Sequence, residues 1–175
     1  MKPTNIINSM TLHTAYLVLG SNQGNRYGYI RKALESIAQL PHTAVSSQSH
    51  LYETAAWGRE DLPPHINVAV AVRTPLAPLS LLRSLQQIET ALDRTRQTRW
   101  GERTIDIDII YFDGLVMNHP DLRLPHPLMQ VRNFVLVPLN EIAPDLQHPV
   151  LRRPTRELLA ACPDTLGVTL LSEVP

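Results

Sequence analysis

The stretch Arg103-Thr-Ile-Asp-Ile-Asp-Ile-Ile-Tyr-Phe112 has the pattern of a β-strand in which two acidic residues interrupt an apolar run. Side chains alternate between the faces of a strand, so Asp106 and Asp108 share one face and the isoleucines between them share the other. The two aspartate Cα atoms are expected about 6.5–7 Å apart. Two carboxylates this close on a central strand are unfavourable unless a cation lies between them.

A hard divalent cation suits this acidic face, because Mg²⁺ takes one or two carboxylates and completes its shell with water and phosphate oxygens. The alternative is a half-exposed strand whose polar face is solvated. The chain has fourteen Arg and only two Lys, and Arg94, Arg96, Arg99 and Arg103 fall within ten residues. The planar guanidinium group matches phosphate oxygens, so a phosphate-rich ligand that arrives with its metal is favoured.

The segments before this strand alternate between strand and helix patterns. Strands are expected over residues 14–19, 43–52, 66–73 and 105–112. Helices are expected over 27–40, ended by Pro41, and from Ala77 to Leu92. The order β-α-β-β-α-β predicts a ferredoxin-like α+β fold, an antiparallel sheet with helices on one face.

The remainder of the chain is expected to extend this core. Asp113-Gly114 predicts a tight hairpin that leads into residues 115–117, and residues 53–64 are expected to form a loop. Further elements are expected over 133–142 (a helix despite Pro138), 155–161 (a short helix) and 168–171 (a last strand). Residues 1–13 are expected to be a poorly ordered extension, and residues 14–175 a single domain.

Composition narrows the class of protein. Its 175 residues carry no net charge, which argues against a general nucleic-acid or membrane-surface binder. No apolar run approaches the roughly 18 residues that a membrane helix needs, and residues 1–10 lack the apolar region of a signal peptide. Cys162 is the only cysteine, which excludes an internal disulfide and a Cys-based zinc site. The cytoplasm is therefore the expected compartment.

Several residues elsewhere could complete a site for a planar ligand. Asn67 lies within an apolar strand, and its amide can both donate and accept, which suits a heteroaromatic ring; satisfaction by the backbone is an equal alternative. Trp57, Trp100 and Phe134 lie in or beside loops, where aromatic rings either stack on a ligand or anchor the loop. His126, held between prolines, could reach a phosphate oxygen, donate a proton or be structural.

Two further patterns bear on the reaction class. Gly20-Ser21-Asn22 lacks the ending of a P-loop and the spacing of a dinucleotide-binding loop, so it is interpreted as a turn that closes the first strand. None of the usual nucleophile arrangements is present in the sequence. Phosphoryl-type transfer needs mainly metal and cationic positioning, which matches these residues.

The run Arg99-Trp-Gly-Glu-Arg-Thr-Ile-Asp-Ile-Asp-Ile-Ile110 resembles the signature of the 6-hydroxymethyl-7,8-dihydropterin pyrophosphokinases of folate biosynthesis. The resemblance extends from about Ala15 to Pro149 and includes Leu19-Gly-Ser-Asn22, Asn67-Val-Ala-Val70 and Pro125-His126. It implies a monomeric, cytoplasmic enzyme that transfers diphosphate from ATP to the pterin hydroxyl and releases AMP. Its implied partners are two Mg²⁺ ions, ATP and the pterin, with no nucleic acid and no membrane.

The resemblance also implies roles for individual residues. Asp106 and Asp108 would bind the two Mg²⁺ ions, and Arg94 and Arg103 would help assemble the closed site around the phosphates. The matches to ATP-binding positions are Gln86, Glu89, Arg96, Trp100, Arg103, Ile109, His126 and Arg132. The matches to the pterin pocket are Thr54, Ala55, Trp57, Asn67, Trp100 and Phe134.

Two other functions remain open for a chain with these features. One is a ferredoxin-like RNA-binding or ligand-sensing module without catalysis, although RNA readers of this fold carry aromatic residues where this chain carries aspartates. The other is a different Mg²⁺-dependent enzyme, such as a nucleotide cyclase or a polymerase palm. Product analysis separates them, because only the diphosphotransferase makes AMP in proportion to pterin.

Overall fold

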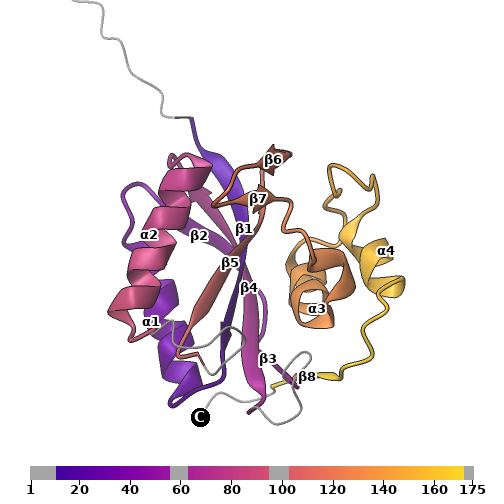
Figure 1. Ribbon diagram of the computed structural model, residues 1–175, viewed down its shortest axis with the longest axis horizontal. Helices are drawn as coiled ribbons and strands as arrows, with labels where there is room; N and C mark the ends of the chain where they lie inside the picture. The colour runs from indigo at the N-terminus through magenta and orange to yellow at the C-terminus, as the bar shows by residue number, and fades with distance from the viewer. Residues whose placement is uncertain (1–10, 56–62, 95–102, 172–175) are drawn as a thin grey trace, which may run out of the picture.

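An antiparallel sheet lies between two layers of helices in the computed structural model, which describes residues 11–55, 63–94 and 103–171 (Figure 1). The strands of this sheet are β1 (His13–Ser21), β2 (Ala44–Gln48), β3 (Tyr52–Thr54), β4 (His65–Thr74), β5 (Asp106–Phe112) and β8 (Val168–Leu170). Their order is β5-β1-β4-β3-β8, and β2 also pairs with β4. The predicted antiparallel sheet with helices is thus confirmed.

Helices α1 (Arg26–Ala38) and α2 (Pro78–Ala91) cover one face of the sheet (Figure 1). The Asn25 side chain accepts a hydrogen bond from the Gly28 N–H at 2.8 Å and caps α1. Pro78 begins α2, where the missing amide hydrogen would have no partner within the helix. Both helices pack on Ile107 and Ile109 of β5 and on alternate residues of β1 and β4.

Helices α3 (Asn133–Ile142) and α4 (Thr155–Ala160) cover the opposite face. The two helices of the predicted core, α1 and α2, thus lie on one face as expected, and the predicted C-terminal helices add a second layer, for which the sequence indicated no face. The reason for the second layer lies in β1 and β4, whose residues Val18 and Ala69 are buried in a second core with Leu136 and Leu139 of α3. Strands that are apolar on both faces need a helical layer on each side.

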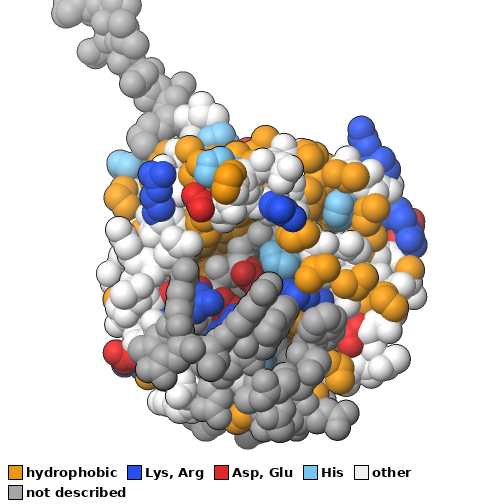
Figure 2. Space-filling model, viewed as in Figure 1, with side chains coloured by type: hydrophobic (Ala, Val, Ile, Leu, Met, Phe, Trp, Pro, Cys, Tyr) orange, Lys and Arg blue, Asp and Glu red, His pale blue; other side chains and the backbone are white. Residues whose placement is uncertain are grey.

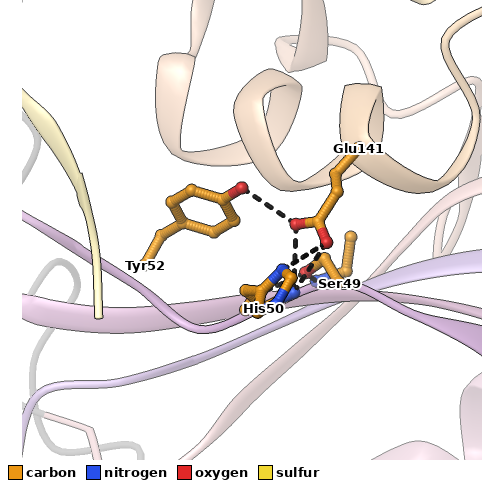
Figure 3. Close-up of polar contacts among 5 residues, drawn as sticks. Ser49, His50, Tyr52 and Glu141 are labelled. Atoms are coloured by element: carbon orange, nitrogen blue, oxygen red, sulfur yellow. Dashed lines mark hydrogen bonds and ion pairs between the residues drawn. The ribbon is translucent and has the colours of Figure 1, made fainter. Parts of the chain in front are cut away.

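The predicted strand over residues 43–52 is instead two strands, β2 and β3, and residues 53–54 belong to β3 rather than to a loop. Glu141 of α3 lies at the break (Figure 3). Its carboxylate accepts hydrogen bonds from the His50 N–H at 3.0 Å and from the Tyr52 hydroxyl at 2.8 Å, and lies 2.6 Å from His50 Nδ1. The Ser49 hydroxyl accepts the Ala69 N–H at 2.9 Å. The Ser49 N–H still donates to the Ala69 carbonyl oxygen at 2.9 Å, whereas the His50 N–H donates to the Glu141 side chain.

The predicted hairpin at residues 113–114 is also wrong. Strand β6 (Met117–Asn118) pairs with β7 (Arg123–Leu124), and the described residues show no pairing of β6 with β5. The carboxylate of Asp113 accepts the Thr14 N–H at 2.8 Å and lies 2.8 Å from His13 Nδ1, so the turn is held against β1. A short 3₁₀ helix, η1 (Met129–Val131), then leads to α3. None of the helices in the described ranges has both the length and the apolar content to cross a membrane.

Candidate active site

The two aspartates of β5 lie on the face of the sheet that α3 covers. Ile107 and Ile109 are buried in the core beneath α1 and α2, whereas Asp106 and Asp108 point away from it and are half-buried. The alternation expected from the sequence is therefore present. Asp106 lies opposite Gly20 of β1, and Asp108 lies opposite Val18.

Two arginines contact Asp106. Arg94 Nη2 donates to Asp106 Oδ1 at 2.8 Å, and Arg103 forms an ion pair with the other carboxylate oxygen. Figure 2 shows acidic, basic and histidine side chains together in the recess between the two helical layers. Arg94, Arg103 and the two aspartates thus form one charged cluster. Its members are up to 14 residues apart in the sequence.

Glu89 of α2 is buried behind this cluster, with 4% of its surface exposed. Its carboxylate accepts the Ile107 N–H at 2.7 Å and forms an ion pair with Arg94. Burial raises the pKa of Glu89, while the Arg94 charge opposes that rise. Gln86 lies one turn earlier on the same side of α2 and is half-buried. Glu89 therefore ties α2 to β5 and holds Arg94 beside Asp106.

The pKa of the Asp108 carboxyl is raised, because the nearby arginines do not offset its burial and the neighbouring acidic groups. Burial raises its pKa to about 7, and the charges of Asp106 and Glu89 add to the rise, whereas Arg132 and Arg103 oppose it. Asp108 consequently binds a proton readily near neutral pH. A cation beside it would displace that proton, because a positive charge stabilises the ionised form.

Two predicted nucleotide-side residues lie next to the aspartates. The His126 N–H donates to the Ile110 carbonyl oxygen at 2.9 Å, and burial together with Arg132 lowers the pKa of the His126 imidazole to about 4. The imidazole is therefore neutral at pH 7. Arg132 precedes α3, and its guanidinium carbon lies 5.6 Å from the centre of the Phe134 ring.

Two of the predicted pterin residues, Asn67 of β4 and Thr54 of β3, lie two and three strands from β5 in the same sheet. Asn67 Nδ2 donates to Thr54 Oγ1 at 2.8 Å, and both side chains are buried. The Asn67 amide therefore has a side-chain hydrogen-bond partner. Ala55 is exposed at the end of this segment. The remaining predicted residues, Trp57, Arg96 and Trp100, lie outside the described residues.

Ile109 differs from the other predicted site residues. Its side chain is buried in the core beneath α1 and α2, with 3% of its surface exposed, on the face opposite to the aspartates. Any contact of this residue with a ligand on the acidic face would have to come from its backbone. The sequence alternation that places the aspartates on one face already excludes the Ile109 side chain from it.

Residues that the sequence analysis did not assign to the site are also close to it. His65 lies two residues before Asn67 on β4, and its pKa is lowered mainly by burial, with the charges of Asp106 and Arg103 acting in opposite directions. The i, i+2 spacing from Asn67 is the signal that could have identified His65. Asn22 contacts the backbone of Arg103, and no sequence pattern indicates that contact.

The donor set suits a hard divalent cation. In the part of the chain that the structure describes, no group of three or more His, Cys, Asp or Glu side chains could hold a metal. Asp106 and Asp108 offer only two carboxylates, which is the number that Mg²⁺ commonly takes from a protein when phosphate and water complete its shell. The arrangement fits a metal that enters with a phosphate ligand.

Comparisons with known proteins agree with this geometry. The sequence matches the family described as 7,8-dihydro-6-hydroxymethylpterin-pyrophosphokinase (HPPK) over residues 16–144. It is 43% identical to a 2-amino-4-hydroxy-6-hydroxymethyldihydropteridine pyrophosphokinase of Pseudomonas aeruginosa, over 87% of this chain and 93% of the relative. The identity to the enzyme of that name from Methylorubrum extorquens is 46%, over 75% of this chain and 84% of the relative.

Among solved structures, a Plasmodium falciparum HPPK-DHPS shares the fold with a TM-score of 0.69 at 19% identity. The match covers 89% of this chain and 45% of that one, so this chain spans less than half of the longer protein. The sequence match over residues 16–144 and the two bacterial relatives settle the family. The chain belongs to the 7,8-dihydro-6-hydroxymethylpterin-pyrophosphokinase family.

Proposed function

We propose that this protein transfers diphosphate from ATP to 6-hydroxymethyl-7,8-dihydropterin and releases AMP, a step of folate biosynthesis. The observation that carries the proposal is the charged cluster of Asp106, Asp108, Arg94 and Arg103 on the same sheet face as the Asn67–Thr54 pair. One part of this face suits metal and phosphate, and the other suits a heteroaromatic ring.

Asp106 and Asp108 are the proposed ligands of two Mg²⁺ ions. When bound there, the metal would neutralise phosphate oxygens and orient the attacking and leaving oxygens. Asp108 must lose its proton to act as a ligand, and its raised pKa leaves it partly protonated near neutral pH. Metal affinity should therefore increase as the pH rises toward neutrality.

Arg94 and Arg103 are the proposed phosphate-binding residues. Both guanidinium groups contact Asp106, and each has further N–H donors that a phosphate could accept. Glu89 acts on Arg94, because its buried carboxylate holds the guanidinium group in place from behind. The other ATP-binding residues proposed are Gln86, Arg96, Trp100, Ile109 (through its backbone), His126 and Arg132.

His126 takes a narrower role than a general acid. Because its pKa is lowered to about 4, the imidazole carries a single ring proton at pH 7 and no positive charge. A neutral imidazole can donate one hydrogen bond to a phosphate oxygen, whereas protonation of a leaving group would need a higher pKa.

Thr54 and Asn67 are the proposed polar contacts of the pterin, with Ala55, Trp57, Trp100 and Phe134 around the ring. The Asn67 amide has one further donor and an acceptor besides the donor that Thr54 accepts. In strand order β5-β1-β4, the Cα atoms of Asp106 and Asn67 are about 10 Å apart. A bicyclic ring that lies across β1 could therefore extend its hydroxymethyl group toward the aspartates.

The proposal also covers the fold, the oligomeric state and the cellular compartment of the protein. We interpret the core as ferredoxin-like, since the sheet order β5-β1-β4 with β2 and β3 beside β4 and the two helices α1 and α2 on one face are typical of that layout. Residues 14–175 are proposed to act as a single monomeric domain in the cytoplasm, without nucleic acid or membrane. Light scattering on the purified full chain measures the oligomeric state.

Product analysis tests the proposed reaction. The full-length protein is incubated with ATP, 6-hydroxymethyl-7,8-dihydropterin and Mg²⁺, and nucleotides are separated by chromatography. We expect one AMP for each pterin consumed, no AMP without pterin, and no turnover by Asp106→Asn or Asp108→Asn. Release of ADP, or AMP formation that is independent of pterin, would exclude the proposal and favour another Mg²⁺-dependent reaction.

A further inference from the structure

Gly20 lies in a row of residues that crosses the sheet. It pairs with Asp106 of β5 on one side and with Asn67 of β4 on the other. Directly paired residues of antiparallel strands project their side chains to the same face, and neighbouring strands are about 5 Å apart. Position 20 therefore separates the carboxylate proposed to bind metal from the amide proposed to bind the pterin.

The absence of a side chain at Gly20 leaves room for the Asn67 amide. A Cβ at position 20 would lie 2.8 Å from Asn67 Oδ1, a distance that real Cβ atoms essentially never show. The next nearest atoms are Asn67 Cγ at 3.9 Å and His65 Cδ2 at 4.0 Å. A methyl group here would displace the Asn67 amide, which Thr54 fixes from its other side, and would disturb little else.

Asn22 holds the backbone of Arg103. The Asn22 N–H donates to the Arg103 carbonyl oxygen at 3.1 Å, and the Arg103 N–H donates to Asn22 Oδ1 at 2.7 Å. Asn22 Nδ2 also donates to the Pro63 carbonyl oxygen at 3.5 Å. The Asn22 side chain is buried, with 2% of its surface exposed. The residue that carries the guanidinium group to Asp106 is thereby fixed at its main chain.

We propose that Gly20 and Asn22 are positioning residues for the two sides of the site. Gly20 leaves space for the Asn67 amide on the pterin side of the site. Asn22 holds the backbone of Arg103 on the phosphate side. This inference rests on the proposed roles of Asn67 and Arg103. The turn after β1 thus sets the relative placement of the two substrates, beyond its role in closing the strand.

The two substitutions should give different kinetic signatures. Gly20→Ala should raise the KM for the pterin by roughly tenfold, because a displaced amide loses about one hydrogen bond, and should change kcat less. Asn22→Ala should lower kcat by roughly tenfold or more and leave the pterin KM nearly unchanged, because Arg103 acts on the phosphates. A turn that served only stability would give no such division between KM and kcat.

Double mutants identify the partner of each residue. Once Asn67 is alanine, the atom that a methyl group at position 20 would meet is gone, so Gly20→Ala should change the pterin KM of Asn67→Ala by less than about twofold. In the same way, Asn22→Ala should change kcat of Arg103→Ala by less than about twofold. If the effects of the single substitutions on KM and kcat multiply in both double mutants, the inference is wrong.

Ser21→Ala is the matched control within this turn. Ser21 projects to the face of Leu17 and Leu19, opposite to the aspartates, and its hydroxyl has no hydrogen-bond partner among the described residues. Its kcat and KM should equal those of the wild type. If Asn22→Ala does not fold, Asn22→Asp keeps an acceptor for the Arg103 N–H and should retain kcat within about threefold; a full loss of kcat in this folded variant would contradict the inference.

The same data separate this inference from the proposed function. Wild-type kinetics in both Asn67→Ala and Arg103→Ala would contradict the proposed site itself. Impaired Asn67→Ala and Arg103→Ala together with wild-type Gly20→Ala and Asn22→Ala would contradict only the positioning roles.

Discussion

Replacement of Asp108 by asparagine should stabilise the metal-free protein while it abolishes activity. The pKa of Asp108 rises from 3.8 to about 7 on folding, mainly because burial disfavours the charged carboxylate. A difference of one pH unit in pKa corresponds to about 1.4 kcal/mol, so ionised Asp108 opposes folding by up to about 4 kcal/mol above pH 7. Asparagine has a similar shape and no charge, so we expect a gain of about 2 kcal/mol or more at pH 8.

The sign of the effect follows from proton binding. Between about pH 4 and pH 7, folded Asp108 keeps its proton and unfolded Asp108 loses it, so the folded state binds more protons. The free energy of unfolding therefore falls as the pH rises through this window. Burial lowers the pKa of His126 and of His65, so these residues contribute the opposite slope. The difference between wild type and Asp108→Asn removes their contribution and isolates Asp108.

Urea denaturation followed by circular dichroism, in EDTA at pH 4 and at pH 8, measures this difference. The two proteins should be similarly stable at pH 4, and Asp108→Asn should be the more stable at pH 8, with a midpoint temperature about 4–8 °C higher in parallel melts. Asp121→Asn is the control, because the Asp121 side chain is 73% exposed and its replacement should change stability by less than about 0.5 kcal/mol. A variant that is equally or less stable at pH 8 would refute the reasoning.

Three further predictions concern other polar residues of the fold and the site. Glu89→Ala should lower the free energy of unfolding by about 3 kcal/mol in urea denaturation, because the Ile107 N–H and the Arg94 charge lose a partner; Glu157→Ala, at an exposed ion pair, is its control. Arg103→Ala should lower the single-turnover rate by roughly 100-fold with little change in pterin affinity, and the reverse pattern would exclude its phosphate role. Glu141→Ala should lower stability by about 1–3 kcal/mol without loss of kcat, and full wild-type stability would show that the His50 contacts are unimportant.

The acidic strand and the two helices that follow β1 and β4 could be predicted from the sequence, because each is decided by a local period. The two-residue period over residues 105–109 places Asp106 and Asp108 on one face, and a helical period with a proline at one end defines α1 and α2. The resemblance then identified candidate residues that lie together in the structure, such as Asn67 and Thr54.

The features that were wrong or missed depend on partners far away in the sequence. At the break between β2 and β3 the His50 N–H donates to Glu141, 91 residues later, and no local sequence pattern near Ser49 indicates this contact. The contact of Asn22 with Arg103 spans 81 residues. Ile109 is different, because its burial on the other face follows from the same alternation that identified the aspartates. Motif matching assigned that residue to the site, and strand geometry restricts it to backbone contacts.

The instability at Asp108 and the proposed binding of metal have the same physical origin. An ionised, half-buried carboxylate beside two other acidic groups is unfavourable in the free protein, and a cation that supplies compensating charge favours the loss of its proton. A ligand that binds only the folded state raises the free energy of unfolding, and the increase grows with the logarithm of ligand concentration over Kd. Mg²⁺ with a nonhydrolysable ATP analogue should therefore stabilise the wild type more strongly at pH 8 than at pH 6. A solvated polar strand would show no such pH dependence, because its carboxylates would already be ionised at both pH values.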